Sequence, residues 1–172
     1  MPSRFSVPGT TLACLALAGL PAFAQTDTKA MLLKHLKTSR DFTLKVADQM
    51  PDADYGFKLT PPQMSFAEQM AHLAGEQEGI LSIISNGQSK PAKPASMNKK
   101  DVIAFVRQSF DKSIDTVSKL TAAQLAKSYQ GGEGGMTGSE VVMYMLDHTT
   151  HHRASAEMYL RAKGITPAEY QF

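Results

Sequence analysis

The chain has 172 residues, of which 18 are Lys or Arg and 16 are Asp or Glu, and 42% of the residues are hydrophobic. This length suits about one domain with a buried core, and the near balance of charge, without a concentrated basic face, argues against nucleic-acid binding. A single cysteine excludes an intramolecular disulfide and a metal site built from several thiolates.

The first 24 residues have the pattern of a secretory signal. Arg4 supplies a basic start, residues 11–20 are mostly apolar, and Ala22-Phe23-Ala24 forms an A-x-A cleavage site. The apolar run is shorter than the roughly 20 residues that a membrane-spanning helix needs. We therefore expect cleavage before Gln25, a secreted or periplasmic protein and no stable membrane insertion.

Cleavage would leave residues 25–172 as one domain of 148 residues, with 17 basic and 16 acidic side chains. Cys14 would leave with the signal, so the mature chain would have no thiol for catalysis or metal binding. A lipid anchor on Cys14 is the weaker alternative, because residues 11–13 match a lipoprotein cleavage box poorly.

Helical periodicity dominates the rest of the chain. The first helix is expected over Asp27–Met50, where Pro51 ends it, and the second begins with a capping box of Ser65 and Glu68 and ends near residues 86–87. The apolar face consists of Leu32, Leu36, Thr43, Val46 and Met50 in the first helix and of Phe66, Met70, Leu73, Ile80 and Ile84 in the second.

A connector over residues 88–97 leads to a third helix that starts near Asn98, and residues 121–127 predict one short extra helix. The glycine-rich segment QGGEGGMTGSE lacks the phosphate-loop pattern and predicts a flexible loop. A second capping box, Thr137 with Glu140, opens a fourth helix that should run to about Lys163. The predicted fold is therefore an all-α four-helix bundle, and the long connectors leave room for crossover connections.

The last helix carries three of the five histidines of the chain. One seam of this helix, spaced by three or four residues, is expected to face the bundle interior: Val141, Met145, His148, His152, Ser155 and Tyr159. His148 and His152 are one turn apart, about 6 Å along the axis, so both can reach one ion. Two ligands alone make a weak site.

His72, midway through the second helix, is the candidate third ligand. Three neutral imidazoles bind zinc, nickel or another late first-row ion and leave a position open for water or substrate. The competing interpretation is that these are hydrogen-bonded core histidines. His151 is expected at the rim of the site, and His35 stands among basic residues and is expected on the surface.

Two segments of the chain, FAEQMAHLAGEQ and LDHTTHHRASAEMYLRAKGITPAEY, resemble the DinB superfamily of four-helix bundles. The resemblance runs from about Lys29 to Phe172. It implies a DinB-like bundle in which His72, His148 and His152 bind a divalent transition metal, zinc or nickel first, with iron or manganese as alternatives. Ala154-Ser155 departs from the Gly-Gln of many relatives. The export signal is unusual for the family, so the thiol-dependent chemistry of its cytoplasmic members is not carried over.

Three functions remain open: a metal-dependent hydrolase or transferase acting on an unknown small molecule, a non-catalytic metal-binding or interaction module, and a bundle used only for protein contacts. In the enzyme, Glu76 is the candidate catalytic base, four residues after His72 on the same face, although a role in orienting a ligand histidine is the simpler interpretation. Asp147 could support His148. Arg153 could bind an anionic group, but an exposed helix arginine is the simpler expectation. Tyr144 and Tyr159 could line the pocket mouth or simply pack, and a homodimer through an exposed face is also open.

Overall fold

The computed structural model describes residues 20–85, 87, 91–130 and 134–171, with side chains from residue 28 onward, so most of the predicted signal lies outside the described residues. Its elements are the helices α1 (Leu20–Gln49), α2 (Phe66–Leu81), α3 (Lys99–Lys119), α4 (Ala122–Ala126) and α5 (Gly138–Ala162), the 3₁₀ turns η1 (Asp52–Asp54) and η2 (Ser82–Ser85), and the strands β1 (Ser128–Tyr129) and β2 (Met136–Thr137).

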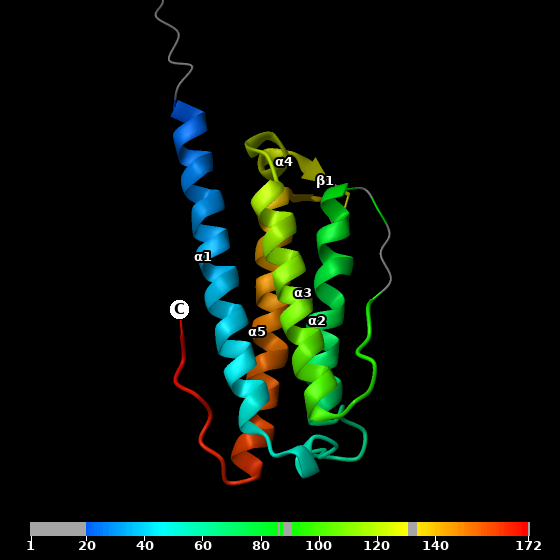
Figure 1. Cartoon of the computed structure of the whole chain (residues 1–172). Helices are drawn as coiled ribbons and strands as arrows, with labels where there is room; N and C mark the ends of the chain where they lie inside the picture. The colour runs from blue at the N-terminus through cyan, green and yellow to red at the C-terminus, as the bar shows by residue number, and fades with distance from the viewer. Residues whose placement is uncertain (1–19, 86, 88–90, 131–133, 172) are drawn as a thin grey trace, which may run out of the picture.

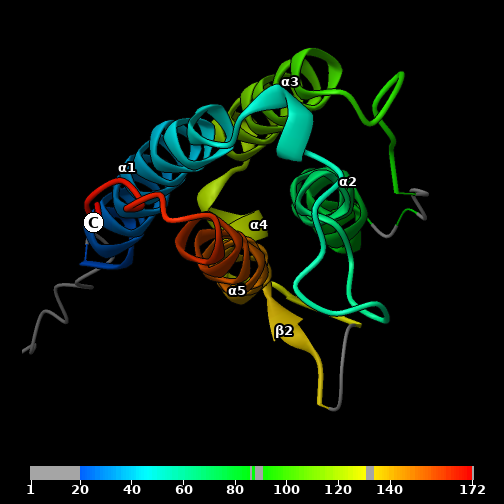
Figure 2. The ribbon, with the colours of Figure 1, turned by 90° about the horizontal axis from the view of Figure 1, so that it is seen from below.

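The four long helices form a bundle in which α1 and α5 run in one direction and α2 and α3 in the other (Figure 1). Seen along the axis, the order around the bundle is α1, α3, α2, α5, so that α5 packs against both α1 and α2 (Figure 2). The connection from α2 to α3 returns along the bundle, which makes these neighbours parallel. The predicted all-α bundle with crossover connections is confirmed.

Both predicted capping boxes form at the helix starts. The hydroxyl of Ser65 accepts a hydrogen bond from the amide of Glu68 at 3.2 Å, and the Glu68 carboxylate accepts one from the amide of Ser65 at 2.6 Å. Thr137 and Glu140 make the same reciprocal pair at the start of α5. The backbone hydrogen bond from Ser65 lowers the pKa of Glu68. These boxes fix where α2 and α5 begin.

Two segments differ from the sequence prediction. α1 begins at Leu20, seven residues before Asp27, because residues 22–24 contain no helix-stopping signal and Pro21 stands in the first turn, where its missing amide hydrogen costs little. The glycine-rich segment, whose residues 131–133 lie outside the described part, is closed by an antiparallel pair in which Ser128 faces Thr137.

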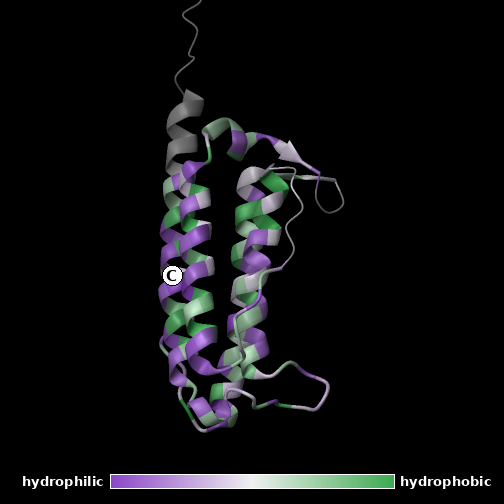
Figure 3. Cartoon of the chain, turned by 45° about the vertical axis from the view of Figure 1, so that its right-hand side comes forward, coloured by the Kyte–Doolittle hydropathy of each residue, from purple (hydrophilic) through white to green (hydrophobic). Residues whose placement is uncertain are grey.

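The core draws apolar side chains from every long helix, and each helix in Figure 3 carries both hydrophilic and hydrophobic residues. All the apolar positions predicted for the first two helices are buried, including the hydroxyl-bearing Thr43. Residues 164–171 fold back on α1: the side chain of Gln49 donates to the carbonyl of Thr166 at 2.9 Å and accepts from the amide of Ala168 at 2.8 Å. Among the described residues, none of the helices is long and apolar enough to cross a membrane.

Gly138, at the start of α5, provides a test of this packing. A Cβ atom there would clash with the carbonyl oxygen of Gln124 and would lie 3.0 Å from Cα of Leu125. Backbone atoms cannot move aside cheaply, so we expect Gly138→Ala to lower the free energy of unfolding by about 1–3 kcal/mol. The control is Gly56→Ala, whose Cβ would have nothing within 4 Å. Thermal unfolding of both variants checks this prediction, and equal midpoints would contradict it.

Candidate metal centre

The register between α2 and α5 places His72 and His152 at the same level along the bundle axis. Near one end of the pair the rings of Phe66 and Tyr159 meet edge to face at 6.4 Å, and the Tyr159 hydroxyl donates to the carbonyl of Met64 at 2.5 Å. His72 lies six residues after Phe66, about 9 Å along α2, and His152 lies seven residues before Tyr159, about 10.5 Å along the antiparallel α5. The two imidazoles are therefore level with one another.

Three imidazoles meet at this height. The ring centroids of His72 and His152 are 4.4 Å apart, those of His148 and His152 4.6 Å, and those of His72 and His148 5.1 Å. One nitrogen from each ring lies within 4.8 Å of the other two. Zinc–nitrogen bonds of about 2.0–2.1 Å put tetrahedral ligand atoms about 3.4 Å apart, so small side-chain movements reach that geometry. This cluster could hold a metal ion.

Gln69 determines which nitrogen of His152 is free. Its side-chain oxygen lies 2.7 Å from Nδ1 of His152. Because an amide oxygen only accepts hydrogen bonds, Nδ1 carries the proton and Nε2 keeps its lone pair. This is the arrangement expected of a metal-binding histidine, whose second nitrogen donates to a neighbouring acceptor.

The other two histidines differ in their surroundings. Nδ1 of His148 is buried and has no hydrogen-bond partner among the described residues, which costs free energy unless a ligand or a water satisfies it. Nδ1 of His72 lies 3.8 Å from a carboxylate oxygen of Glu76, and both side chains are about one-third exposed, at 32% and 30%. The chemistry of this donor set thus fits a divalent transition-metal ion.

Burial sets the charge of the cluster. Burial lowers the pKa of His148 and lowers that of His152 to about 4, and the neighbouring imidazoles act in the same direction. On His148 the Glu76 carboxylate acts in the opposite direction. Both rings are neutral at pH 7, which is the state that binds a metal.

The model of the DinB family matches residues 24–172. The chain belongs to the DinB family. The uncharacterized protein YjoA of Bacillus subtilis (strain 168) is 20% identical over 139 residues, which are 78% of this chain and 90% of YjoA.

Two crystal structures have the same fold. That of the DinB-like protein YjoA superposes with a TM-score of 0.66 at 19% identity and covers 81% of this chain and 96% of YjoA. That of a DinB-like protein from Bacillus cereus ATCC 10987 gives a TM-score of 0.71 at 19% identity, with coverage of 81% and 95%. At this identity the structures establish the fold alone.

Several side chains of this DinB protein lie elsewhere than predicted. Arg153, predicted to be exposed, is buried, with only 4% of its surface exposed. Its guanidinium carbon lies 4.4 Å from the centroid of the Phe42 ring, and burial lowers its pKa. Asp147 is exposed and lines a hollow between α1 and α5 rather than supporting His148. His35 is half-buried and lines the same hollow. Ser155 is only half-buried, and its hydroxyl donates to the carbonyl of His151.

The predictions for His151 and Tyr159 of α5 agree with the structure. His151 is exposed and meets the edge of His152 at a centroid distance of 4.9 Å, which is a rim position. Tyr159 is buried and packs, whereas Tyr144 is 47% exposed. Gln69 was not among the residues singled out from the sequence. Its spacing of three residues before His72 puts the two on one helix face and was the available signal.

Removing the Gln69 acceptor should weaken metal binding without unfolding the bundle. We expect Gln69→Leu to lower zinc affinity by about 10- to 100-fold, because Nδ1–H of His152 loses the group that holds its tautomer and ring orientation. Competition with a zinc chelator measures this change. Gln108→Leu, on the distant α3, is the control, and equal affinities in the two variants would show that Gln69 does not support the site.

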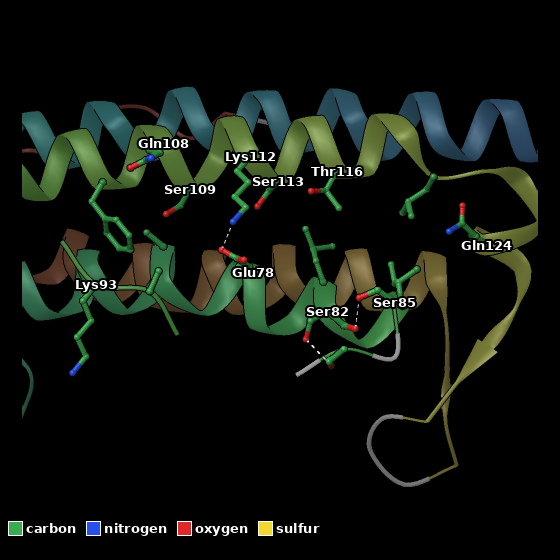
Figure 4. Close-up of a pocket in the computed structure, with 17 residues that line it drawn as sticks. Glu78, Ser82, Ser85, Lys93, Gln108, Ser109, Lys112, Ser113, Thr116 and Gln124 are labelled. Atoms are coloured by element: carbon green, nitrogen blue, oxygen red, sulfur yellow. Dashed lines mark hydrogen bonds and ion pairs between the residues drawn. The ribbon is translucent and has the colours of Figure 1, made fainter. Parts of the chain in front are cut away.

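A hollow of about 640 Å³ lies between α2 and α3, and no histidine is among the described residues that line it (Figure 4). Hydroxyl side chains line much of it, and the ion pair between Glu78 and Lys112, at 2.6 Å, spans it. It therefore offers no imidazole ligands for a metal and is separate from the cluster of His72, His148 and His152.

Proposed function

We propose that this DinB protein is an exported metal-dependent enzyme, a hydrolase or a transferase, whose zinc or nickel ion is held by His72, His148 and His152. The observation that carries the proposal is the approach of three imidazole nitrogens to within 4.8 Å beside a hollow large enough for a substrate. Iron and manganese are the weaker alternatives for an all-imidazole site.

The hollow that His72 lines has a volume of about 420 Å³, within the range of small-molecule sites. Its lining consists of Met64, Glu68, Ala71, His72, Gly75, Glu76, Pro91, Ala92, Lys93, Pro94 and Met97. The connector after α2 packs so closely that a Cβ on Gly75 would lie 2.5 Å from the carbonyl oxygen of Ala92. His72 and Glu76 thus border a largely apolar chamber.

Bound ions of this kind supply Lewis-acid polarisation of a substrate group and acidify water. The protein side chains do the rest. Gln69 orients His152, and the connector residues Pro91, Ala92 and Pro94 line the same hollow as His72. Glu76 lies beside His72 with a partly exposed carboxylate, placed to accept a proton from a nucleophile in the chamber.

The alternative is a non-catalytic metal-binding or interaction module, which would close the coordination sphere with a fourth protein ligand. Among the described residues the group that could hold an ion comprises three histidines, and Glu76 is not a member. A coordination position left to water or substrate would favour the enzyme.

Export is the second part of the proposal. Its support is the signal-like pattern of residues 1–24 and the start of the family match at residue 24, which coincides with the predicted cleavage site. Mass spectrometry of the protein recovered from expressing cells tests it. A mature chain beginning at Gln25 in the extracytoplasmic fraction is expected, and an intact Met1 in the cytoplasm alone would overturn it.

The enzyme proposal is tested with Glu76→Gln. We expect this variant to keep its metal and to lose about 10²-fold or more in metal-dependent turnover on a substrate found by screening hydrolase and transferase panels. Glu78→Gln, two residues along and paired with Lys112 on the α3 side, is the matched control. Unchanged turnover in Glu76→Gln would remove Glu76 from the mechanism. The absence of any metal-dependent turnover across the panels would favour the non-catalytic module.

A further inference from the structure

A separate hollow of about 380 Å³ lies between α1 and α5, whereas the histidine centre lies between α2 and α5. The hollow has apolar and polar walls. Its lining consists of Met31, Leu32, His35, Thr38, Ser39, Met143, Leu146, Asp147, Thr150, Arg153, Tyr170 and Gln171. No residue of α2 and none of the three clustered histidines lines this hollow.

Arg153 is the buried charge of this hollow. The side chain of Arg153 donates from Nη1 to the hydroxyl of Ser39 at 3.1 Å and from Nη2 to the hydroxyl of Thr150 at 3.4 Å. Its Nε is buried without a hydrogen-bond partner among the described residues. The carboxylate of Glu157, one turn along α5, forms an ion pair with Nε at 3.9 Å, a distance too long for a hydrogen bond. A guanidinium has five N–H donors, so this one is under-satisfied.

A buried guanidinium held by two hydroxyl groups and by an ion pair too long for a hydrogen bond gains stability from an anion that accepts hydrogen bonds from it. The fork of Arg153 matches a carboxylate, which can accept two parallel hydrogen bonds from it. Met31 and Met143, which are 47% and 50% exposed, line another part of the same hollow and offer an apolar surface.

We propose that the hollow between α1 and α5 binds a small monocarboxylate, with its carboxylate on Arg153 and its apolar body against Met31, Met143 and Leu146. The exposed carboxylate of Asp147, which also lines the hollow, repels a second negative charge, and Glu157 adds to this effect. These two acids select a singly charged ligand over a phosphate or a dicarboxylate. His35 and Tyr170 are the other titratable groups of the lining.

The test uses metal-free mature protein and two probes of the same shape, hexanoate and the uncharged hexanamide. We expect saturable binding of hexanoate, seen as shifts of α1 and α5 resonances in NMR titration, and binding of hexanamide at least about tenfold weaker, because charge-assisted hydrogen bonds are lost. Arg153→Gln should reduce hexanoate affinity by a similar factor, and Arg153→Lys should recover part of it.

Because a buried arginine also packs on Phe42, the decisive variant is the exposed Asp147→Asn, which leaves the core untouched. Removal of its negative charge should tighten hexanoate binding about two- to fivefold and leave hexanamide unchanged. Asp115→Asn, an exposed acid on α3, is the matched control and should change neither affinity. Equal binding of the two probes, no binding of hexanoate, or an Asp147→Asn affinity equal to that of Asp115→Asn would each overturn the proposal. None of these results depends on the histidine centre.

Discussion

Mature protein purified without a histidine tag is expected to carry close to one divalent transition-metal ion per chain, and the variant with His72, His148 and His152 all changed to alanine is expected to carry none. The three ring nitrogens within 4.8 Å of one another are the donors that would be lost. Elemental analysis by mass spectrometry gives the stoichiometry and identifies the ion. Each single alanine variant should lose most of its metal, because two imidazoles make a weak site.

Thermal unfolding gives an independent measure of the same binding. Zinc or nickel added at 100 times its dissociation constant should raise the free energy of unfolding by about 2.7 kcal/mol in the wild type and leave the triple variant unchanged. Because the triple variant has no ligand set, it also separates binding in the cluster from binding to other groups.

His151→Ala is the matched control, since this exposed histidine lies in the same turn but at the rim of the cluster. We expect it to keep its metal. If His151→Ala lost as much metal as His148→Ala, the assignment of His72, His148 and His152 as the ligands would be wrong. A wild-type protein that is empty and takes up neither zinc nor nickel would contradict the metal centre as a whole.

The starts of α2 and α5 were predictable because they depend on neighbouring residues. A serine or threonine followed three residues later by a glutamate has its partners within one turn, and the boxes at Ser65 and Thr137 form as the sequence indicates. The pairing of His148 with His152 is equally local. His72 was a candidate third ligand from its place in the second helix, and the family resemblance strengthened this prediction, because a single sequence does not specify the register of two helices that are far apart in the chain. The contact of Phe66 with Tyr159 fixes that register.

Arg153 shows where reasoning from one helix fails. It lies about 100 degrees around α5 from His152, which suggests a solvent-facing position if only one face of α5 is buried. In the bundle α5 packs against both α1 and α2, and the second contact buries Arg153 over Phe42. The number of neighbours that a helix has is a property of the whole bundle, so neither this burial nor the hollow beside it could be inferred from periodicity.

Acid is expected to destabilise the metal-free protein through His148 and His152. Burial places the pKa of His152 at about 4 in the folded protein and lowers that of His148, whereas an unfolded histidine titrates near its ordinary value of 6.5. Between these limits the unfolded chain binds more protons than the folded one, so stability falls as the pH drops from about 6.5 towards 4. After allowance for solvent screening at these partly exposed rings, the loss should be about 1 kcal/mol.

Urea unfolding in the presence of a chelator, at several pH values from 7.5 to 4, measures this loss. The double variant His148→Asn/His152→Asn keeps the polarity of the site without its titration, so its stability should depend less on pH over this window. Zinc-loaded wild type should lose more stability than the metal-free protein on acidification, because protons then compete with the ion for the same nitrogens. Identical pH dependences of the metal-free wild type and the double variant would show that the two buried imidazoles are not responsible.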